Sequence, residues 1–161
     1  QFVENYRKLQ KISKPKLAPV GVGSLIGGIL KLYASPAINT EIDDPGAIIS
    51  IDRAQIEQVI INLLKNASEA CEDSGRDPRI VLSVKSHSQE RDLIISVSDN
   101  GNGILPEVMD RIFVPFFSTK SGGSGIGLAL CKQIISLHGG TISASSDIEN
   151  HKTEFAIVLP C

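Results

Sequence analysis

The stretch Arg53-Ala-Gln-Ile-Glu-Gln-Val-Ile-Ile-Asn-Leu-Leu-Lys-Asn-Ala-Ser-Glu-Ala70 predicts the long helix around which the chain is organised. Apolar residues recur along it at three- and four-residue steps, so one face of the helix forms a core stripe. The members of this stripe are Ile56, Val59, Ile60, Leu63, Leu64 and Ala67. Asp52 stands where an N-cap is wanted, and the pattern continues to about Asp73.

Two asparagines lie at the edge of this stripe. Asn62 and Asn66 are one turn apart, and Glu69 follows three residues later on the same side. Asparagine is a poor residue for a helix interior, because its side chain competes for the backbone hydrogen bonds. The pair is either an ordinary polar boundary or a rim of amide oxygens that faces a metal–phosphate group. The helix alone leaves both interpretations open.

Length and composition restrict the class of protein. The 161 residues fit one domain, or one domain with a short appendage, and the net charge of −2 gives no hint of a nucleic-acid-binding surface. The sequence contains no apolar run as long as a membrane span and no signal peptide, so a soluble piece is expected. Cys71, Cys131 and Cys161 are far apart. Their spacing favours reduced thiols in a cytoplasmic protein over disulfides or zinc ligands.

The N-terminal residues differ from the rest of the chain. Residues 1–11 carry an apolar face too short to form a core, which predicts the end of a longer helix that lacks its partner. Pro15 and Pro19 then predict a linker. We therefore divide the chain into an appendage at residues 1–19 and a domain at residues 20–161.

The remaining patterns alternate between helix and strand. A short helix is expected at Ser24–Tyr33, with Ser24 as its cap. Two strands, Ala37–Ile42 and Ala47–Ile51, are expected on either side of a turn. The later elements expected are the hairpin Arg79–His87 with Asp92–Asp99, the helices Pro106–Ile112 and Ile126–Leu137, and the strands Thr141–Ser145 and Thr153–Leu159. Because most strand neighbours are linked by hairpins, this order predicts an α+β fold, a two-layer sandwich whose mixed, mostly antiparallel sheet is covered by helices on one face.

Two glycine-rich stretches follow predicted elements. Asp99-Asn-Gly-Asn-Gly103 is either a turn or a carboxylate fixed at a strand end, where it accepts a hydrogen bond from an amine such as that of adenine. Gly122-Gly-Ser-Gly-Ile-Gly127 is either a flexible loop or a set of amides that binds an anion at a helix start. It fits neither the P-loop nor the dinucleotide pattern.

The segment between these stretches is Phe113-Val-Pro-Phe-Phe-Ser-Thr-Lys120. Phe116 and Phe117 are candidates for the core. They are equally candidates for the anchor of a mobile lid, whose Thr119 and Lys120 would reach a phosphate.

Taken in order, four motifs resemble the N, G1, F and G2 boxes of the sensor histidine kinases. They are Asn62-x-x-x-Asn66-Ala, Asp99-x-Gly-x-Gly, Phe113-x-Pro-Phe116 and Gly123-x-Gly-x-Gly. The resemblance spans roughly Ala47 to Pro160 and places the chain in the wider group of gyrase B, Hsp90 and MutL. The N-terminal stretch resembles the end of a dimerisation helix and the linker of nitrogen-regulation-type kinases.

This resemblance implies a Bergerat-type ATP-binding fold with ATP and Mg²⁺ as ligands. By it, Asp99 would bind the adenine amine, Asn66 would ligate magnesium and Asn62 would be catalytic. The other nucleotide-binding residues that it implies are Gly101, Gly103, Phe116, Thr119, Lys120, Gly123, Gly125 and Gly127. The chain departs from many kinases at Ser68-Glu69-Ala70, where a basic and an aromatic residue are usual.

The function expected from the resemblance is the catalytic domain of a two-component sensor histidine kinase. It would transfer the γ-phosphoryl group of Mg-ATP to a histidine on a dimerisation domain outside this chain. The expected partners are that domain and a response regulator. We expect a monomeric fragment, a homodimeric full protein and a cytoplasmic location, with the full-length protein either free or anchored to a membrane. One alternative is an ATP-sensing or partner-binding module without phosphotransfer. The other is an ATP-hydrolysing clamp, which is disfavoured because Asn62 stands where such a clamp has a glutamate base.

Overall fold

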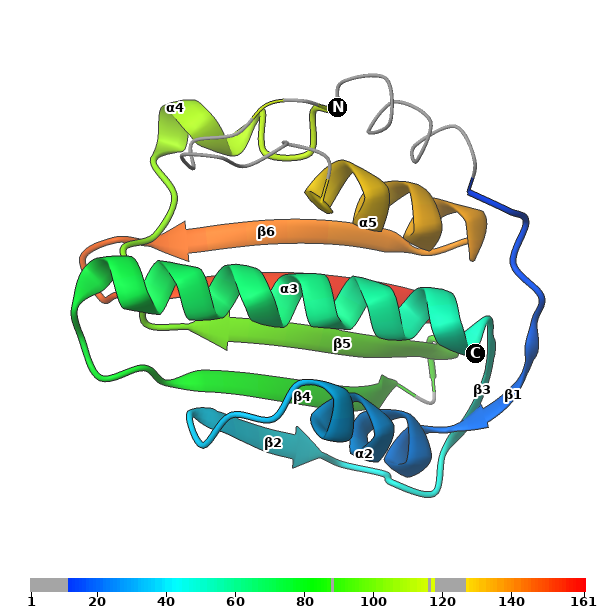
Figure 1. Cartoon of the computed structure of the whole chain (residues 1–161). Helices are drawn as coiled ribbons and strands as arrows, with labels where there is room; N and C mark the ends of the chain where they lie inside the picture. Colours follow the sequence, from blue (N-terminus) through cyan, green and yellow to red (C-terminus); the bar gives the residue numbers. More distant parts are fainter. Residues whose placement is uncertain (1–11, 88, 116, 118–126) are drawn as a thin grey trace.

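The fold is a five-stranded sheet that carries its helices on one face (Figure 1). A computed structural model describes residues 12–87, 89–115, 117 and 127–161. Its elements are β1 (Ala18–Gly21), α2 (Val22–Leu32), β2 (Ile38–Ile42), β3 (Ile48–Ile51), α3 (Arg53–Ser74), β4 (Ile80–His87), β5 (Asp92–Asp99), α4 (Pro106–Met109), α5 (Gly127–Leu137), β6 (Thr141–Asp147) and β7 (Lys152–Pro160).

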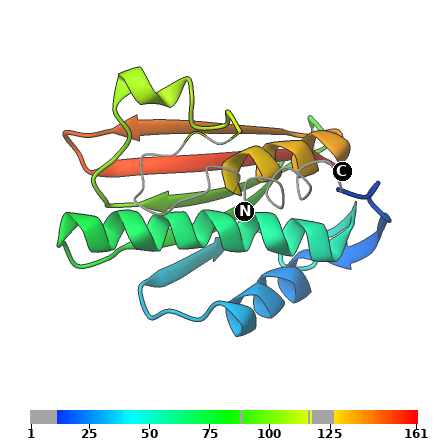
Figure 2. The same ribbon diagram turned by 45° about the horizontal axis from the view of Figure 1, so that its top comes forward.

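The sheet has the strand order β2-β4-β5-β7-β6. β2 lies parallel to β4, and the other neighbouring strands are antiparallel. A separate two-stranded sheet joins β1 to β3. Helices α2, α3 and α5 lie on the same side of the large sheet in both views (Figures 1 and 2). The predicted α+β sandwich is confirmed.

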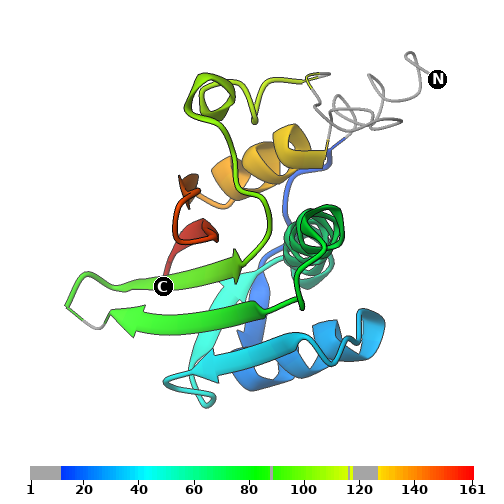
Figure 3. The same ribbon diagram turned by 90° about the vertical axis from the view of Figure 1, so that its left-hand side faces the viewer.

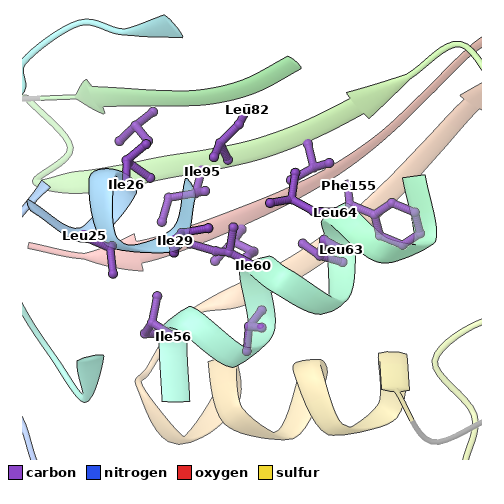
Figure 4. Packing of buried hydrophobic residues seen from close by; sticks show 14 of the residues in the cluster. Leu25, Ile26, Ile29, Ile56, Ile60, Leu63, Leu64, Leu82, Ile95 and Phe155 are labelled. Atoms are coloured by element: carbon purple, nitrogen blue, oxygen red, sulfur yellow. The ribbon is translucent and has the colours of Figure 1, made fainter. Parts of the chain in front are cut away.

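Helix α3 is the centre of the hydrophobic core. Its predicted stripe is buried along its whole length, and Cys71 extends it by one turn. Side chains from α2 and from the inner face of the sheet surround it, as Figure 4 shows for Leu25, Leu82 and Ile95. The helix ends at Gly75, whose left-handed φ of 72° suits a residue without a Cβ. The sequence therefore predicted both the extent and the buried face of this helix.

The first strands are paired differently from the expectation. The strands expected at residues 37–42 and 47–51 belong to separate sheets, because β2 pairs with β4 and β3 pairs with β1. β1 was not expected, since Pro15 and Pro19 predicted a linker. Pro19 is tolerated because it lies in a two-stranded sheet, where a missing N–H can face away from the partner.

Ser24 was wrong as the cap of the first helix. Helix α2 begins at Val22, and its N-cap residue Gly21 makes no side-chain hydrogen bond. The first amides of the helix donate instead to backbone carbonyls before β3, from Val22 to Ala47 (2.9 Å) and from Gly23 to Pro45 (3.0 Å). Ser24 accepts a hydrogen bond from Arg53 on α3. Tertiary contact thus replaces local capping at this end.

Two of the later helices compare differently with their predicted boundaries. The helix predicted at residues 106–112 is shorter, since α4 ends at Met109 and turns follow it. The stop predicted after α5 is confirmed, with Gly139 at a φ of +77° and the Gly140 amide bonded to the carbonyl of Ile135. Among the described helices, none is long and apolar enough to cross a membrane.

Asp52 connects three parts of the chain at the start of α3. Its carboxylate accepts the N–H groups of Gln55 (3.2 Å) and Lys16 (3.0 Å), so it caps the helix and holds the preceding segment. Its own N–H donates to Nε2 of His138 at the end of α5 (3.1 Å). Burial alone would raise the pKa of the Asp52 carboxyl. The N–H groups of Lys16 and Gln55 that donate to it lower the pKa by more in total, so the pKa lies below its usual value.

Replacing Asp52 by alanine is expected to lower the free energy of unfolding at neutral pH by about 1 kcal/mol, the usual effect of losing an N-cap. Because the pKa is lowered in the folded state, the ionised carboxylate stabilises the fold above its unfolded pKa of about 3.9. This contribution is lost as the pH falls through the folded pKa. Urea unfolding of both proteins should therefore show a difference that shrinks below about pH 4. A difference that stays constant down to pH 3 would contradict this role.

Candidate functional site

A cavity of about 670 Å³ opens between α3, α4 and the carboxyl end of β5. Among the described residues, it brings the first glycine stretch together with one asparagine of α3. Its lining among the described residues is Asn66, Glu69, Ala70, Glu72, Asp73, Asp99, Asn102, Gly103, Ile104, Leu105, Val108, Ile112, Leu128, Thr153 and Phe155.

Asp99 lies at the last position of β5, with its residue only 7% exposed. One carboxylate oxygen accepts the N–H of Gly101 at 2.9 Å, which fixes the orientation of the group. A carboxylate has about four acceptor positions, so Asp99 can also accept a hydrogen bond from a ligand amine. The interpretation of this stretch as a positioned carboxylate is therefore favoured over a simple turn.

The two glycines after Asp99 allow close approach of backbone to backbone. A Cβ on Gly101 would lie 2.6 Å from the carbonyl carbon of Ala70 on α3. Gly103 has a left-handed φ of +85°, and a Cβ there would lie 2.8 Å from Oγ of Ser146. Only glycine fits either position without a shift of its neighbours. The loop is thereby held against α3 on one side and against β6 on the other.

Asn100 and Arg76 fasten this loop to the segment after α3. Asn100 accepts the N–H of Arg79 (2.9 Å) and donates to the carbonyl of Asp77 (2.9 Å). The guanidinium of Arg76 donates to the carbonyls of Asn100 (3.3 Å) and Gly101 (3.2 Å). These bonds hold the loop in one conformation, so the cavity is largely formed before a ligand arrives.

Thr153 is a site residue that the sequence reasoning missed. It is buried on β7 directly opposite Asp99 in the strand register, and both line the cavity. Its hydroxyl contacts Oγ of Ser146 (2.9 Å), which also accepts the N–H of Ile104 (2.9 Å). In the sequence, Thr153 was predicted only as the first residue of a strand. Only the pairing of β5 with β7 brings it beside the carboxylate.

Asn66 and Glu69 are brought together on the α3 wall of the cavity, each with polar contacts of its own. Glu72 and Asp73 line the same wall one turn later. Amide and carboxylate oxygens are the donors that hard cations prefer. This wall is therefore suited to a magnesium ion, and a polyphosphate alone would be repelled by its carboxylates.

Asn62 does not line the cavity with Asn66. Its side-chain amide donates to Sγ of Cys131 on α5 (3.8 Å), and the thiol donates to the carbonyl of Val59 (3.8 Å). Burial raises the pKa of the Cys131 thiol to about 12, so it stays protonated. In the described structure, Asn62 joins the two helices that flank the site.

The remaining wall of the cavity is apolar. Ile104, Leu105 and Val108 form one side, and Leu128 and Phe155 form another. Phe113 packs edge-on against Phe155, at 6.3 Å between ring centroids, and Nζ of Lys132 lies 5.7 Å above the Phe113 ring. A flat aromatic base fits such a slot. The apolar residues after Gly103 were a signal available in the sequence, but it was not used.

Gly127 begins α5, next to the lining residue Leu128, and is not itself in the lining. The other predicted phosphate and lid residues lie outside the described residues. They are Phe116, Thr119, Lys120, Gly123 and Gly125.

Residues 51–161 match the protein family described as "Histidine kinase-, DNA gyrase B-, and HSP90-like ATPase". Sporulation kinase D of Bacillus subtilis is 31% identical over 99% of this chain and 32% of its own length. The sensory histidine kinase/phosphatase NtrB of Rhizobium leguminosarum is 35% identical over 88% of this chain and 41% of its own length. The chain thus spans about a third of the first of these relatives.

Solved structures of histidine kinase ThkA have the same fold. Its catalytic domain superposes with a TM-score of 0.78 at 30% identity, covering 90% of this chain and 95% of that domain. ThkA in complex with the response regulator protein TrrA gives a TM-score of 0.78 at 27% identity, covering 99% of this chain and 46% of ThkA.

Proposed function

We propose that this chain, which belongs to the family of histidine kinase-, DNA gyrase B- and HSP90-like ATPases, holds Mg-ATP for transfer of the γ-phosphoryl group to a histidine on another domain. The buried Asp99 carboxylate, backed by the Gly101 amide at the end of the cavity, is the observation that carries the proposal. Sensor histidine kinases among the relatives favour this activity over that of the other family members.

Asp99 would select adenine by charge and hydrogen bonding. An exocyclic amine donates to a carboxylate, whereas the carbonyl of guanine in the same place would face a like partial charge. The apolar residues Ile104 and Leu105 would lie against the base, and Thr153 would offer a hydroxyl beside Asp99. ATP is therefore expected to bind more tightly than GTP.

Asn66 and Glu69 would hold magnesium at the phosphate end of the nucleotide. The neutral amide of Asn66 completes an oxygen shell without adding charge repulsion to the phosphates. Bound magnesium would neutralise charge that develops on the phosphates during transfer. Glu69 stands where many kinases have a basic residue, and its position on the cavity wall supports a contact with the metal or with its water ligands.

Asn62 would act by positioning. Its hydrogen bond to Cys131 sets α5 against α3, and α5 begins at the glycine stretch expected to hold phosphates. An amide cannot accept a proton from water as a glutamate can. ATP hydrolysis by the chain alone is therefore expected to be slow. Slow hydrolysis suits a domain that transfers the phosphoryl group to another domain, because the group is not lost to water.

The acceptor histidine and the partners would lie outside this chain. None of its histidines, His87, His138 and His151, is followed by the acidic and apolar residues expected of a phosphoacceptor. His138 is engaged at both ring nitrogens, with Asp52 and with the carbonyl of Ile134 (2.9 Å). The ThkA complex with a response regulator supports a partner of that class for the full protein. In this proposal, residues 1–19 connect the ATP-binding domain to a dimerisation domain.

Incubation with γ-labelled ATP tests this function. The chain alone is expected to remain unlabelled and to release phosphate slowly, whereas the separately made dimerisation domain should become labelled when it is added. Acid lability of the label should identify phosphohistidine. The Asn66→Ala variant should bind ATP in EDTA like the wild type but transfer little label with magnesium. Label on the chain alone, or none on the added domain at high concentration, would refute the proposed function.

A further inference from the structure

We propose that the tip of the β4–β5 hairpin is a binding site for a zinc-like divalent cation, formed by His87, Glu90 and Asp92 with Cys161 as the fourth donor. Neither the nucleotide site nor the family match involves these residues in metal binding. The C-terminus of the chain lies beside this hairpin in two views (Figures 1 and 3). The three hairpin donors lie within 4.8 Å of one another.

The spacing of the donor atoms is close to that of a metal shell. Nδ1 of His87 lies 3.6 Å from Oδ1 of Asp92 and 3.8 Å from Oε2 of Glu90. Donors about 2.0–2.2 Å from a tetrahedral zinc ion stand about 3.4 Å apart. Small side-chain rotations would therefore bring the three hairpin donors to this spacing, without a change in the strand pairing of His87 with Asp92. The sulfur of Cys161 is not within the 4.8 Å group and would have to turn towards them to complete the shell.

Asp92 contributes a buried carboxylate oxygen to the proposed site. Its Oδ1 atom is buried and makes no hydrogen bond among the described residues, and its side chain is 19% exposed. Nδ1 of His87, 3.6 Å away, forms an ion pair with it only when the imidazole is protonated. Buried carboxylate oxygens are normally hydrogen-bonded, ion-paired or metal-bound. A second carboxylate, Glu90, lies nearby, so an ion of charge +2 would offset the repulsion between them.

A backbone hydrogen bond holds Cys161 next to the tip of the hairpin. Its N–H donates to the carbonyl of Arg91 (2.9 Å), and the residue lines a cavity of about 230 Å³ together with His87 and Asp92. The cysteine spacing in the sequence gave no zinc pattern, because these donors are joined only by the fold.

The donor types indicate which cation would bind. Imidazole and thiolate favour zinc and similar transition metals, whereas Mg²⁺ and Ca²⁺ prefer oxygen. The site is also remote from the nucleotide, since His87 and Asp92 stand at the opposite end of the hairpin from Asp99. Asp99 follows Asp92 by seven steps along β5, about 24 Å at the usual rise. Failure at one site would therefore leave the other proposal intact.

Zinc titration of the tag-free chain without nucleotide tests the site, using a chromophoric chelator as competitor. One equivalent of Zn²⁺ is expected to bind with a micromolar or lower dissociation constant, and millimolar Mg²⁺ should not displace it. His87→Asn and Asp92→Asn should each weaken binding at least tenfold, since even outer-shell changes cost that much. Co²⁺ in place of zinc should give a thiolate charge-transfer band that Cys161→Ser removes.

The matched control is His151→Asn, which removes an exposed histidine from a different turn. His151 has a positive φ of 53°, a conformation that asparagine also tolerates. This variant should bind zinc like the wild type, and circular dichroism should show all variants folded. Equal zinc affinity for the wild type and His87→Asn would overturn the proposal. So would the absence of the cobalt charge-transfer band, because the four-donor shell would then be wrong.

Discussion

Asp99→Asn is expected to weaken ATP binding about ten- to a hundredfold while leaving the fold intact. A hydrogen bond to a charged group contributes roughly 1.5–3 kcal/mol, and the asparagine amide can present a donor where the adenine amine also donates. Isothermal titration with ATP and GTP measures the effect, and the wild type should prefer ATP.

The control for this substitution is Asp77→Asn, which removes the same charge from an exposed loop residue whose side chain is outside the cavity. Only the backbone carbonyl of Asp77 contacts Asn100 in the loop that follows Asp99. This variant should keep the affinity of the wild type. Identical titration curves for ATP and GTP on the wild type would show that Asp99 does not select the base.

Gly101→Ala is expected to lower the free energy of unfolding by about 1–3 kcal/mol, the usual cost of overpacking. The added methyl group would overlap the backbone of α3 at Ala70, which cannot move aside as a flexible side chain would. The loop that carries Asp99 and Gly103 would shift instead. ATP affinity should therefore fall together with stability, which thermal unfolding and titration can measure on the same sample.

Gly27→Ala serves as the matched control, because a Cβ at this exposed helical position meets nothing within 4 Å. Alanine is favoured over glycine in a helix by up to about 1 kcal/mol, so this variant should be more stable than the wild type. The two alanine substitutions are thus expected to have effects of opposite sign. Equal melting temperatures for both variants would argue against the close packing of Gly101 on α3.

Elements with a strong local signal were predicted well. The periodicity of α3, the alternation in β4 and β5 and the glycine stop after α5 are each a property of a few neighbouring residues. β1 and the start of α2 were mispredicted, because their hydrogen-bond partners lie far along the chain in β3 and the turn before it. Propensity at Pro19 and Ser24 gave no information about those partners.

The candidate site divides in the same way. Asp99, Gly103 and Asn66 were identified from the order of motifs, and the structure brings them to one cavity. The arrangement of Thr153 beside Asp99 required knowledge that β7 pairs with β5. Asn62 was placed with Asn66 by its spacing, yet its amide contacts Cys131 on the neighbouring helix.

The sequence by itself determined the residue types available for chemistry: a carboxylate before glycines, an amide one turn from another amide, and a buried helix stripe. These follow from local periodicity and from the backbone freedom of glycine. Only the tertiary structure decided which of these groups meet. Strand register placed Thr153 opposite Asp99, and helix packing turned Asn62 towards α5. The physical reason is that pairing and packing are satisfied between distant segments, where the burial of apolar surface, rather than local propensity, selects the partner.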